Sequence, residues 1–215
     1  MGIPTDITLY TVATPNGIKI SILLEELGLE YKVRAIDVSI NEQKEPWFLK
    51  INPNGRLPAV TDKWTDGSDI HVFESGAILQ YLVDRYDKDN RVSYSRDSKE
   101  IWEVNSWLHW QIGGVGPMQG QAKHFINAAP EKNQYSIDRY INETRRLYSV
   151  MESQLAKSTS GFLVGNRVTI ADCALFGWVL DRDYTGISLD KFPHIDKWLR
   201  TLSQRPAFQK GRQVP

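Results

Sequence analysis

Two short segments combine residue types that suit the binding of a peptide ligand. In Leu57-Pro58 a proline stands directly before a strand-like apolar triplet, where a cis bond would turn the chain and expose the Leu57 backbone. In Glu74-Ser75 a strand pattern gives way to a helical one, so a carboxylate, free amides and the positive end of a helix come together. A ligand with an extended backbone, an α-amino group and an α-carboxylate would satisfy both segments, and glutathione is the common small molecule that fits.

Each segment also has a purely structural interpretation. A serine at the start of a helix is usually only its cap, and most peptide bonds that precede proline are trans. Neither segment alone identifies a ligand site. The prediction of a peptide site therefore depends on their joint occurrence in one short stretch of chain.

A third segment, Thr14-Pro15-Asn16-Gly17, concerns the thiol of such a ligand. The reference thiol pKa of about 8.5 leaves little thiolate at neutral pH, so an enzyme must favour the anion. Side-chain donors at Thr14 and Asn16, with the amides and dipole of a helix start, are placed to do so. Thr14 as an N-cap before Pro15 is an equally good interpretation on the residues alone. Tyr10, on the preceding strand, is a further candidate, whereas no cysteine stands in this segment to form a mixed disulfide with glutathione.

Composition excludes several other classes of function. The chain has 215 residues, 41% of them hydrophobic, and its 26 Lys and Arg balance its 26 Asp and Glu without a basic run. This argues against nucleic-acid binding and against a membrane-surface helix. The N-terminus has no basic and apolar leader pattern, so we expect a cytoplasmic protein that does not enter membranes. The single cysteine, Cys173, excludes an internal disulfide and is expected to fill the core.

The elements that must position these segments form an α/β pattern followed by an all-α one. Residues 1–86 predict a thioredoxin-like domain in which a hairpin turns at Asp66-Gly67. We expect its strands from residue 7 and at 31–37, 59–62 and 69–73, and its helices after residue 17 and at 43–51 and 75–86. The polar stretch 87–97 predicts a linker, and 98–215 an all-helical domain.

The helical domain carries two local signals in addition to its apolar periodicity. Helices are expected at 100–110 and 135–155, paired as an antiparallel bundle. Gly113, Gly114 and Gly116 before Pro117 predict an interruption of a long helix. Thr169 and Asp172 are spaced as a capping box, whose main role is folding.

The segments together resemble a known family. Arg56-Leu57-Pro58-Ala59 and Glu74-Ser75-Gly76-Ala77-Ile78 resemble the glutathione-binding signature of cytosolic glutathione transferases. With Thr14-Pro15-Asn16-Gly17 and Gly113-Gly114-Val115-Gly116-Pro117-Met118-Gln119-Gly120-Gln121, the chain is similar to the nu class and to the fungal nitrogen-regulator-like branch.

The resemblance implies a glutathione site with assigned roles. Asn16 and Thr14 would lie beside the sulfur, the Leu57 backbone would pair with the cysteinyl residue, and Glu74 and Ser75 would hold the γ-glutamyl ammonium and carboxylate. Gln43, Lys44 and Arg56 are placed to reach the glycyl end, although surface cations are mostly solvated. Arg139 matches a position that reaches glutathione from the neighbouring subunit. The second substrate would meet a wall of residues that are otherwise core: Trp107, Trp110, Met118, His124 and Phe125.

We therefore expect a homodimeric, metal-free enzyme with glutathione as co-substrate. It would act by conjugation to a small electrophile, by disulfide-bond reduction or by reduction of an organic hydroperoxide. A dimer is also favoured by aromatic residues in excess of what a monomer needs: Tyr81, Tyr86, Tyr94 and Trp102. The alternative is a non-catalytic glutathione-binding regulatory protein, for which an Asn/Gln-rich extension would be expected; a translation-factor subunit would continue into further domains.

Overall fold

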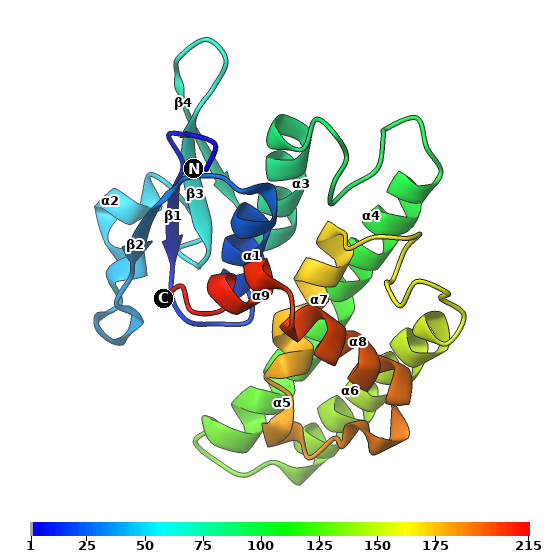
Figure 1. The fold of residues 1–215 in the computed structure, drawn as a ribbon. Coiled ribbons are helices and arrows are strands. Elements are labelled where there is room, and N and C mark those ends of the chain that lie inside the picture. The colour runs from blue at the N-terminus through cyan, green and yellow to red at the C-terminus, as the bar shows by residue number, and fades with distance from the viewer. Residues whose placement is uncertain (1) are drawn as a thin grey trace. The chain divides into compact units, whose positions relative to one another are not determined.

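The structure, a computed structural model, describes residues 2–215 as two compact units (Figure 1). The first unit extends to Val92 and also contains Arg205–Pro215, and the second is Ser93–Gln204. Within the described residues, all the strands lie in the first unit and the second is helical. The predicted class, a thioredoxin-like α/β domain with an all-helical domain, is confirmed.

The first unit is built on a four-stranded sheet in the order β2-β1-β3-β4. β1 pairs with β2 in parallel, and β3 pairs with both β1 and β4 in antiparallel fashion. The hairpin between β3 and β4 turns where Asp66-Gly67 predicts it, with Gly67 in the left-handed region at φ 84°. The strands are β1 (Thr8–Thr11), β2 (Lys32–Ala35), β3 (Ala59–Lys63) and β4 (Asp69–Phe73).

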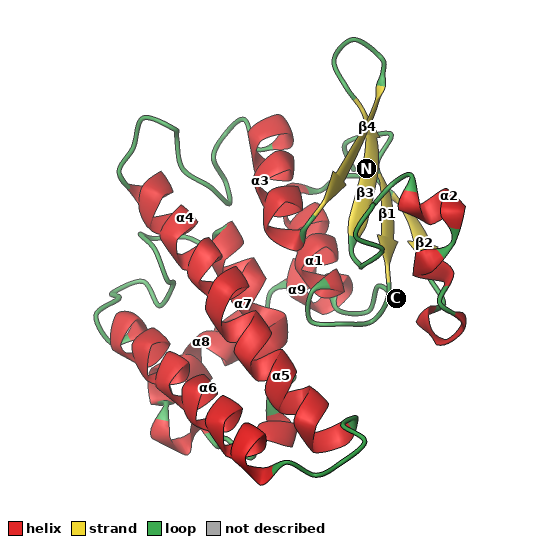
Figure 2. Cartoon of the chain, turned by 180° about the vertical axis from the view of Figure 1, so that it is seen from behind, coloured by secondary structure: helices red, strands yellow, loops and turns green. Residues whose placement is uncertain are grey.

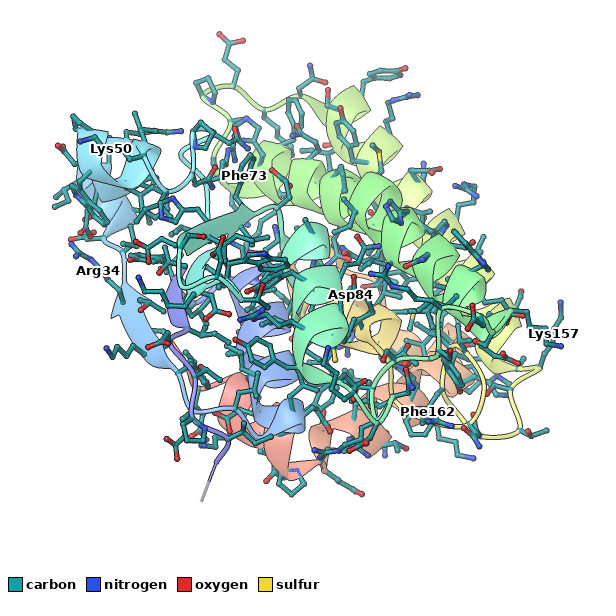
Figure 3. The ribbon with its side chains drawn as sticks, turned by 90° about the horizontal axis from the view of Figure 1, so that it is seen from above. Arg34, Lys50, Phe73, Asp84, Lys157 and Phe162 are labelled. Carbon is teal, nitrogen blue, oxygen red and sulfur yellow. The ribbon has the colours of Figure 1, made fainter. Side chains whose placement is uncertain are left out.

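Helices cover both faces of this sheet (Figures 1 and 2). α1 (Gly17–Leu27) and α3 (Ser75–Tyr86) pack together on one face. The short α2 (Pro46–Leu49), after the 3-10 turns Val38–Ile40 and Glu42–Lys44, covers the other face through Phe48. The predicted helix at 43–51 is therefore split, because Pro46 starts a new helix at its first turn. Figure 3 shows Arg34 beside α2, where its guanidinium lies 4.0 Å from the ring centroid of Trp47.

The last helix, α9 (Pro206–Gly211), packs against α1 and so joins the first unit. A Cβ at Gly211 would stand 2.6 Å from the Ile22 backbone, so only glycine allows this approach. The Ser21 hydroxyl donates to the Gly211 carbonyl at 2.7 Å, and Arg205 makes two bonds of 2.7 and 2.9 Å to the Glu26 carboxylate. The predicted boundaries placed residues 98–215 in the helical domain, whereas Arg205–Pro215 lies in the first unit.

The second unit is a helical bundle around α7, whose residues are nearly all buried (Figure 2). The predicted interruption before Pro117 takes the form of a wider, π-helical turn at Gln111–Val115 between two regular helices. The main helices are α4 (Glu100–Trp110), α5 (Gly116–Asn127), α6 (Gln134–Leu155), α7 (Ile170–Leu180) and α8 (Pro193–Ser203), with 3-10 turns at Asp183–Thr185 and Leu189–Lys191.

Asp172 is the polar centre of this bundle. The predicted capping box of Thr169 and Asp172 is present at the start of α7. The buried carboxylate also accepts from the Leu163 amide at 3.2 Å and from the Trp198 indole at 2.8 Å. Cys173 beside it is fully buried, as expected for a core residue.

Two further features of the described residues concern membranes and metals. In residues 2–215 no helix is both long and apolar enough to cross a membrane. Over the same residues, no group of three or more His, Cys, Asp or Glu side chains is arranged to hold a metal ion.

Candidate functional site

The strand register brings the three predicted segments to one edge of the sheet. Ala59, the first residue of β3, pairs with Phe73, the last of β4, and also with Tyr10 near the end of β1. Leu57-Pro58 immediately precedes Ala59, Glu74-Ser75 immediately follows Phe73, and the Thr14–Gly17 turn follows β1. Figure 3 labels Phe73 at the end of β4, where this edge begins. The segments are therefore neighbours although the sequence separates them.

Leu57 presents its backbone at this edge. The Leu57-Pro58 bond is cis, as the proline at this position indicated. Within residues 2–215, neither the amide nor the carbonyl of Leu57 has a hydrogen-bond partner. The loop before it is held by the buried Asn52, whose amide donates to the Arg56 carbonyl at 2.7 Å and whose Oδ1 accepts from the Asn54 amide at 3.0 Å. Because these bonds fix the loop, the amide and carbonyl of Leu57 stay available to pair with another extended chain.

Glu74 adopts a backbone conformation that is unfavourable for its residue type. Its φ is 68° and its ψ 120°, outside the regions that a non-glycine residue normally occupies. Such conformations concentrate at functional sites, where the surrounding structure imposes them. The side chain is exposed, and its Oε1 accepts from the Asn54 amide at 3.2 Å. The carboxylate is thus held beside the loop that carries Leu57.

Ser75 begins α3 and is 6% exposed. The first backbone bond of the helix runs from the Ile78 amide to the Glu74 carbonyl at 2.9 Å, so the amides of Ser75, Gly76 and Ala77 precede it. These amides and the helix dipole favour an anion. The predicted carboxylate-binding position therefore adjoins the Glu74 carboxylate.

Lys19 of α1 lies beneath this position. Its side chain is 1% exposed, and its Nζ donates to the Ser75 hydroxyl at 3.2 Å. Burial lowers the pKa of Lys19 from its ordinary value to about 7, and the nearby Glu74 carboxylate opposes that shift in part. A buried cation thus underlies the predicted anion site.

The segment at the start of α1 is arranged as a helix cap. The Thr14 hydroxyl accepts from the Gly17 amide at 3.1 Å and lies 3.3 Å from the Val12 carbonyl. Asn16 is the residue directly before α1, with helical φ and ψ of −80° and −35°, and its side chain does not cap the helix. Thr14 therefore has a structural task in this turn, and Asn16 stays the residue predicted to contact a ligand sulfur.

Tyr10 belongs to a different part of the first unit. Its ring centroid lies 6.3 Å from that of Trp47 and 6.0 Å from that of Phe48, within the cluster that α2 covers. The ring therefore has a packing role beneath α2.

The residues proposed for the far end of the ligand lie around the Asn52–Arg56 loop. Lys44 donates from Nζ to the Asn54 carbonyl at 3.2 Å. The Oε1 atom of Gln43 is buried without a hydrogen-bond partner in residues 2–215. Arg56 is exposed. The orphaned Gln43 oxygen could accept from an amide of a bound peptide.

Arg139 lies in the second unit, unlike the other predicted site residues. It is exposed on α6 and lines an open hollow of about 750 Å³ with Met118 of α5. The remaining residues of the predicted wall contact one another: the rings of Trp107 and Trp110 are 5.0 Å apart, and those of His124 and Phe125 5.2 Å.

The aromatic residues that suggested a dimer are mostly engaged within the chain. The hydroxyls of Tyr81 and Tyr86 both donate to Asp62 Oδ2, at 2.7 and 2.5 Å. Tyr94 hydrogen-bonds with Asn166. Only the fourth, Trp102, is strongly exposed, at 68%. Aromatic surplus is therefore a poor argument for the dimer.

Two residues of the site were missed from the sequence. Asn54 holds the Glu74 carboxylate, and Lys19 holds the Ser75 hydroxyl. A signal for Lys19 was present, because it interrupts an apolar run on a helix that is buried nearly all round. Asn54 gave no comparable signal, since asparagine before glycine is typical of any turn.

Comparisons with known proteins give consistent results. Residues 5–84 match the family model described as glutathione S-transferase, N-terminal domain, and residues 110–206 the model of the C-terminal domain. The Escherichia coli K12 protein named disulfide-bond oxidoreductase YfcG is 40% identical over 94% of this chain and 92% of that protein. The crystal structure of a glutathione transferase homolog from Lodderomyces elongisporus, with two GSH per subunit, has a TM-score of 0.93 and 47% identity over 98% of this chain and 99% of that one.

A regulatory protein is also similar. Transcriptional regulator URE2 of Saccharomyces cerevisiae is 35% identical over 93% of this chain. The match spans only 65% of that protein's length. Similarity alone therefore does not separate enzymes from regulators here.

Proposed function

From the premise that this chain belongs to the glutathione S-transferase family, we propose that it binds glutathione at the sheet edge and uses it as co-substrate. One observation carries the proposal. The unpaired Leu57 backbone and the Glu74-Ser75 pair lie at the same edge, which matches the extended backbone and the charged γ-glutamyl end of that tripeptide.

The ligand would be held by a distinct group at each position. The Leu57 backbone pairs with the cysteinyl residue, Glu74 accepts from the α-ammonium, and Ser75 and its neighbouring amides donate to the α-carboxylate. Gln43, Lys44 and Arg56 face the glycyl end. This orientation directs the thiol toward the start of α1.

Asn16 would stabilise the thiolate there. Its amide can donate a hydrogen bond to sulfur but cannot accept a proton as a base, so its effect is to lower the thiol pKa. Thr14 holds the turn that positions it. The buried Cys173 takes no part, because a fully buried thiol cannot reach a substrate.

The reaction that we favour is the reduction of disulfides. Two glutathione thiols are oxidised to glutathione disulfide while the substrate disulfide takes up the two electrons and two protons as a pair of thiols. The name of the Escherichia coli relative and the two GSH per subunit in the Lodderomyces elongisporus structure support this choice. Conjugation to electrophiles and hydroperoxide reduction use the same thiolate and remain further candidates.

A panel assay tests the choice. Hydroxyethyl disulfide, cumene hydroperoxide and a chlorinated dinitroaromatic are each supplied with glutathione, with Asn16→Ala as a control in which turnover should be reduced. Turnover fastest with the disulfide is expected. Tight glutathione binding by calorimetry without turnover of any substrate would instead support the regulatory alternative, which the similarity to URE2 favours.

We also propose a homodimer, to which Arg139 would contribute from the neighbouring subunit. Sedimentation equilibrium should give about twice the chain mass of 24.6 kDa at micromolar concentration. Arg139→Ala should weaken glutathione binding if the arginine reaches the partner's site. A monomer mass would exclude both parts of this proposal. The cytoplasmic location expected from the sequence stays a prediction.

A further inference from the structure

Lys19 occupies a buried position at which its charged side chain is energetically unfavourable. It stands between Ile18 and Ile20 on α1, and its side chain is 1% exposed. A buried ammonium loses its hydration, and a methionine of similar length could fill the same space without that loss. A role in folding alone therefore does not account for a lysine here.

The hydrogen bond from Lys19 to Ser75 has a defined direction. A protonated lysine has three donors and no acceptor, so its bond of 3.2 Å uses a lone pair of the Ser75 oxygen. The hydroxyl proton cannot then point toward Lys19. It is left for an acceptor outside the protein, on the side where the free amides of α3 begin.

We propose that Lys19 is a positioning residue for the γ-glutamyl carboxylate of glutathione, acting through Ser75 by directing the hydroxyl proton toward the ligand. The inference rests on the proposed function, since it concerns the same site. It adds that recognition of the carboxylate requires a cation that the ligand does not touch.

The charged groups around Lys19 leave Glu74 as its main counter-charge. From α9, Arg205 and Lys210 are paired with Glu26 and Glu25, near the other end of α1.

The charged and titratable groups of α3 and β4 also have other partners. From α3, Tyr81 and Tyr86 bond to Asp62, and Arg85 lies beside the same carboxylate. From β4, His71 lies 3.2 Å from the Lys50 carbonyl, at the end of α2. Glu74 is the carboxylate whose charge acts on Lys19.

The protonation of Lys19 should therefore be linked to ligand binding. A neutral amine can accept the Ser75 proton, which removes the donor from the carboxylate position. Because burial brings the pKa of Lys19 to about 7, the amine form becomes populated just above neutral pH. A bound carboxylate favours the ammonium, so binding above that pH should take up a proton.

The test compares two ligands and two variants by isothermal titration calorimetry. The ligands are glutathione and its analogue with a primary amide in place of the γ-glutamyl α-carboxylate. The variants are Lys19→Met and, as a matched loss of one positive charge, Lys88→Met at an exposed position after α3. Titrations at pH 6, 7 and 8 in buffers of different ionisation heat report the proton uptake.

For wild type we expect the ratio of the Kd of glutathione to that of the amide to rise by up to about tenfold from pH 6 to 8, with glutathione taking up more protons than the amide at pH 8. Ionisation of the thiol is common to the two ligands and cancels in this comparison. At pH 6, Lys19→Met should weaken glutathione by about tenfold and remove the difference in pH dependence between the two ligands, whereas Lys88→Met should behave as wild type.

Two results would overturn the inference. Equal pH dependence of glutathione and its amide in wild type would do so without any variant, and so would an unchanged profile in Lys19→Met. In both cases glutathione still binds and the proposed function stands. Failure of wild type to bind glutathione at any pH would instead overturn the proposed function and this inference together.

Discussion

Asp172 in the second unit and Lys19 in the first are both buried charged side chains beside the start of a helix, and their hydrogen-bonding surroundings differ. In the second unit, Asp172 at the start of α7 accepts from the Leu163 amide, the Thr169 amide and hydroxyl, and the Trp198 indole. In the first unit, Lys19 bonds to Ser75, whose hydroxyl proton and neighbouring amides are left for a ligand. In the first arrangement, protein donors satisfy the buried carboxylate. In the second, donors around the buried ammonium remain available to a ligand.

We interpret the difference as one between a structural polar group and a group that serves the proposed ligand site. A buried charge that protein donors satisfy holds loops and helices together and needs nothing else. A buried charge that supports an incomplete set of donors lowers the stability of the free protein and is compensated when a ligand completes the set. Removing Asp172 should therefore impair folding, and removing residues of the sheet edge should impair binding or turnover.

The largest effect is expected from Asp172→Ala. It leaves buried donors unpaired at the cap of α7, on α8 and in the preceding loop, and should lower the free energy of unfolding by about 3–5 kcal/mol. Urea denaturation followed by tryptophan fluorescence measures this. The control is Asp183→Ala, because that side chain is 92% exposed. If Asp172→Ala lowered the free energy of unfolding no more than the control does, Asp172 would not have the structural role assigned to it.

Asn16→Ala should act on turnover and leave folding intact. The loss of one donor to a thiolate in a partly closed site should reduce turnover by roughly tenfold to a thousandfold and raise the bound thiol's pKa. Glutathione affinity should fall less. Ultraviolet titration of the bound thiolate in Asn16→Ala, Thr14→Ala and Tyr10→Phe identifies the residue responsible. If only Tyr10→Phe shifted the pKa of the bound thiol, Tyr10 on β1 and not Asn16 would be the residue that activates the thiol.

Glu74→Ala should act on affinity. It removes a charged hydrogen bond to the ligand's ammonium, which should weaken glutathione binding by about 1.5–3 kcal/mol in calorimetry. The same change keeps the positive φ at this position and removes only an exposed hydrogen bond from Asn54, so stability should change little. An unchanged affinity would show that the ammonium binds elsewhere.

The smallest effect is the pH dependence of stability due to Lys19. The pKa of Lys19 falls from 10.5 to about 7 on folding, so between these values the unfolded chain binds more protons. Stability of the ligand-free protein should therefore rise with pH, by on the order of 1–2 kcal/mol from pH 7 to 9. Lys19→Met should remove this slope and stabilise the free protein at pH 7, while it weakens glutathione. Loss of stability in that variant would indicate a structural lysine.

Local patterns in the sequence predicted much of this structure. Apolar periodicity located α3, α4 and α6 closely, Asp66-Gly67 marked the hairpin turn, and the Thr169–Asp172 spacing predicted the cap of α7. Each of these signals involves residues within a few positions of one another, whose geometry depends little on the rest of the chain. Leu57-Pro58 and Glu74-Ser75 were predictable for the same reason, as the ends of two adjacent strands.

The sequence by itself therefore determined the fold class and the caps and turns, and it predicted a set of side chains for the ligand site. Only the tertiary structure decided which distant residues support them. In that structure α9 packs in the first unit, through contacts of Gly211 and Arg205 with α1. Lys19 lies beneath Ser75. The physical reason is that the energetic effect of a buried charge or of a close backbone approach depends on its neighbours in space. Residue spacing along the chain does not specify those neighbours.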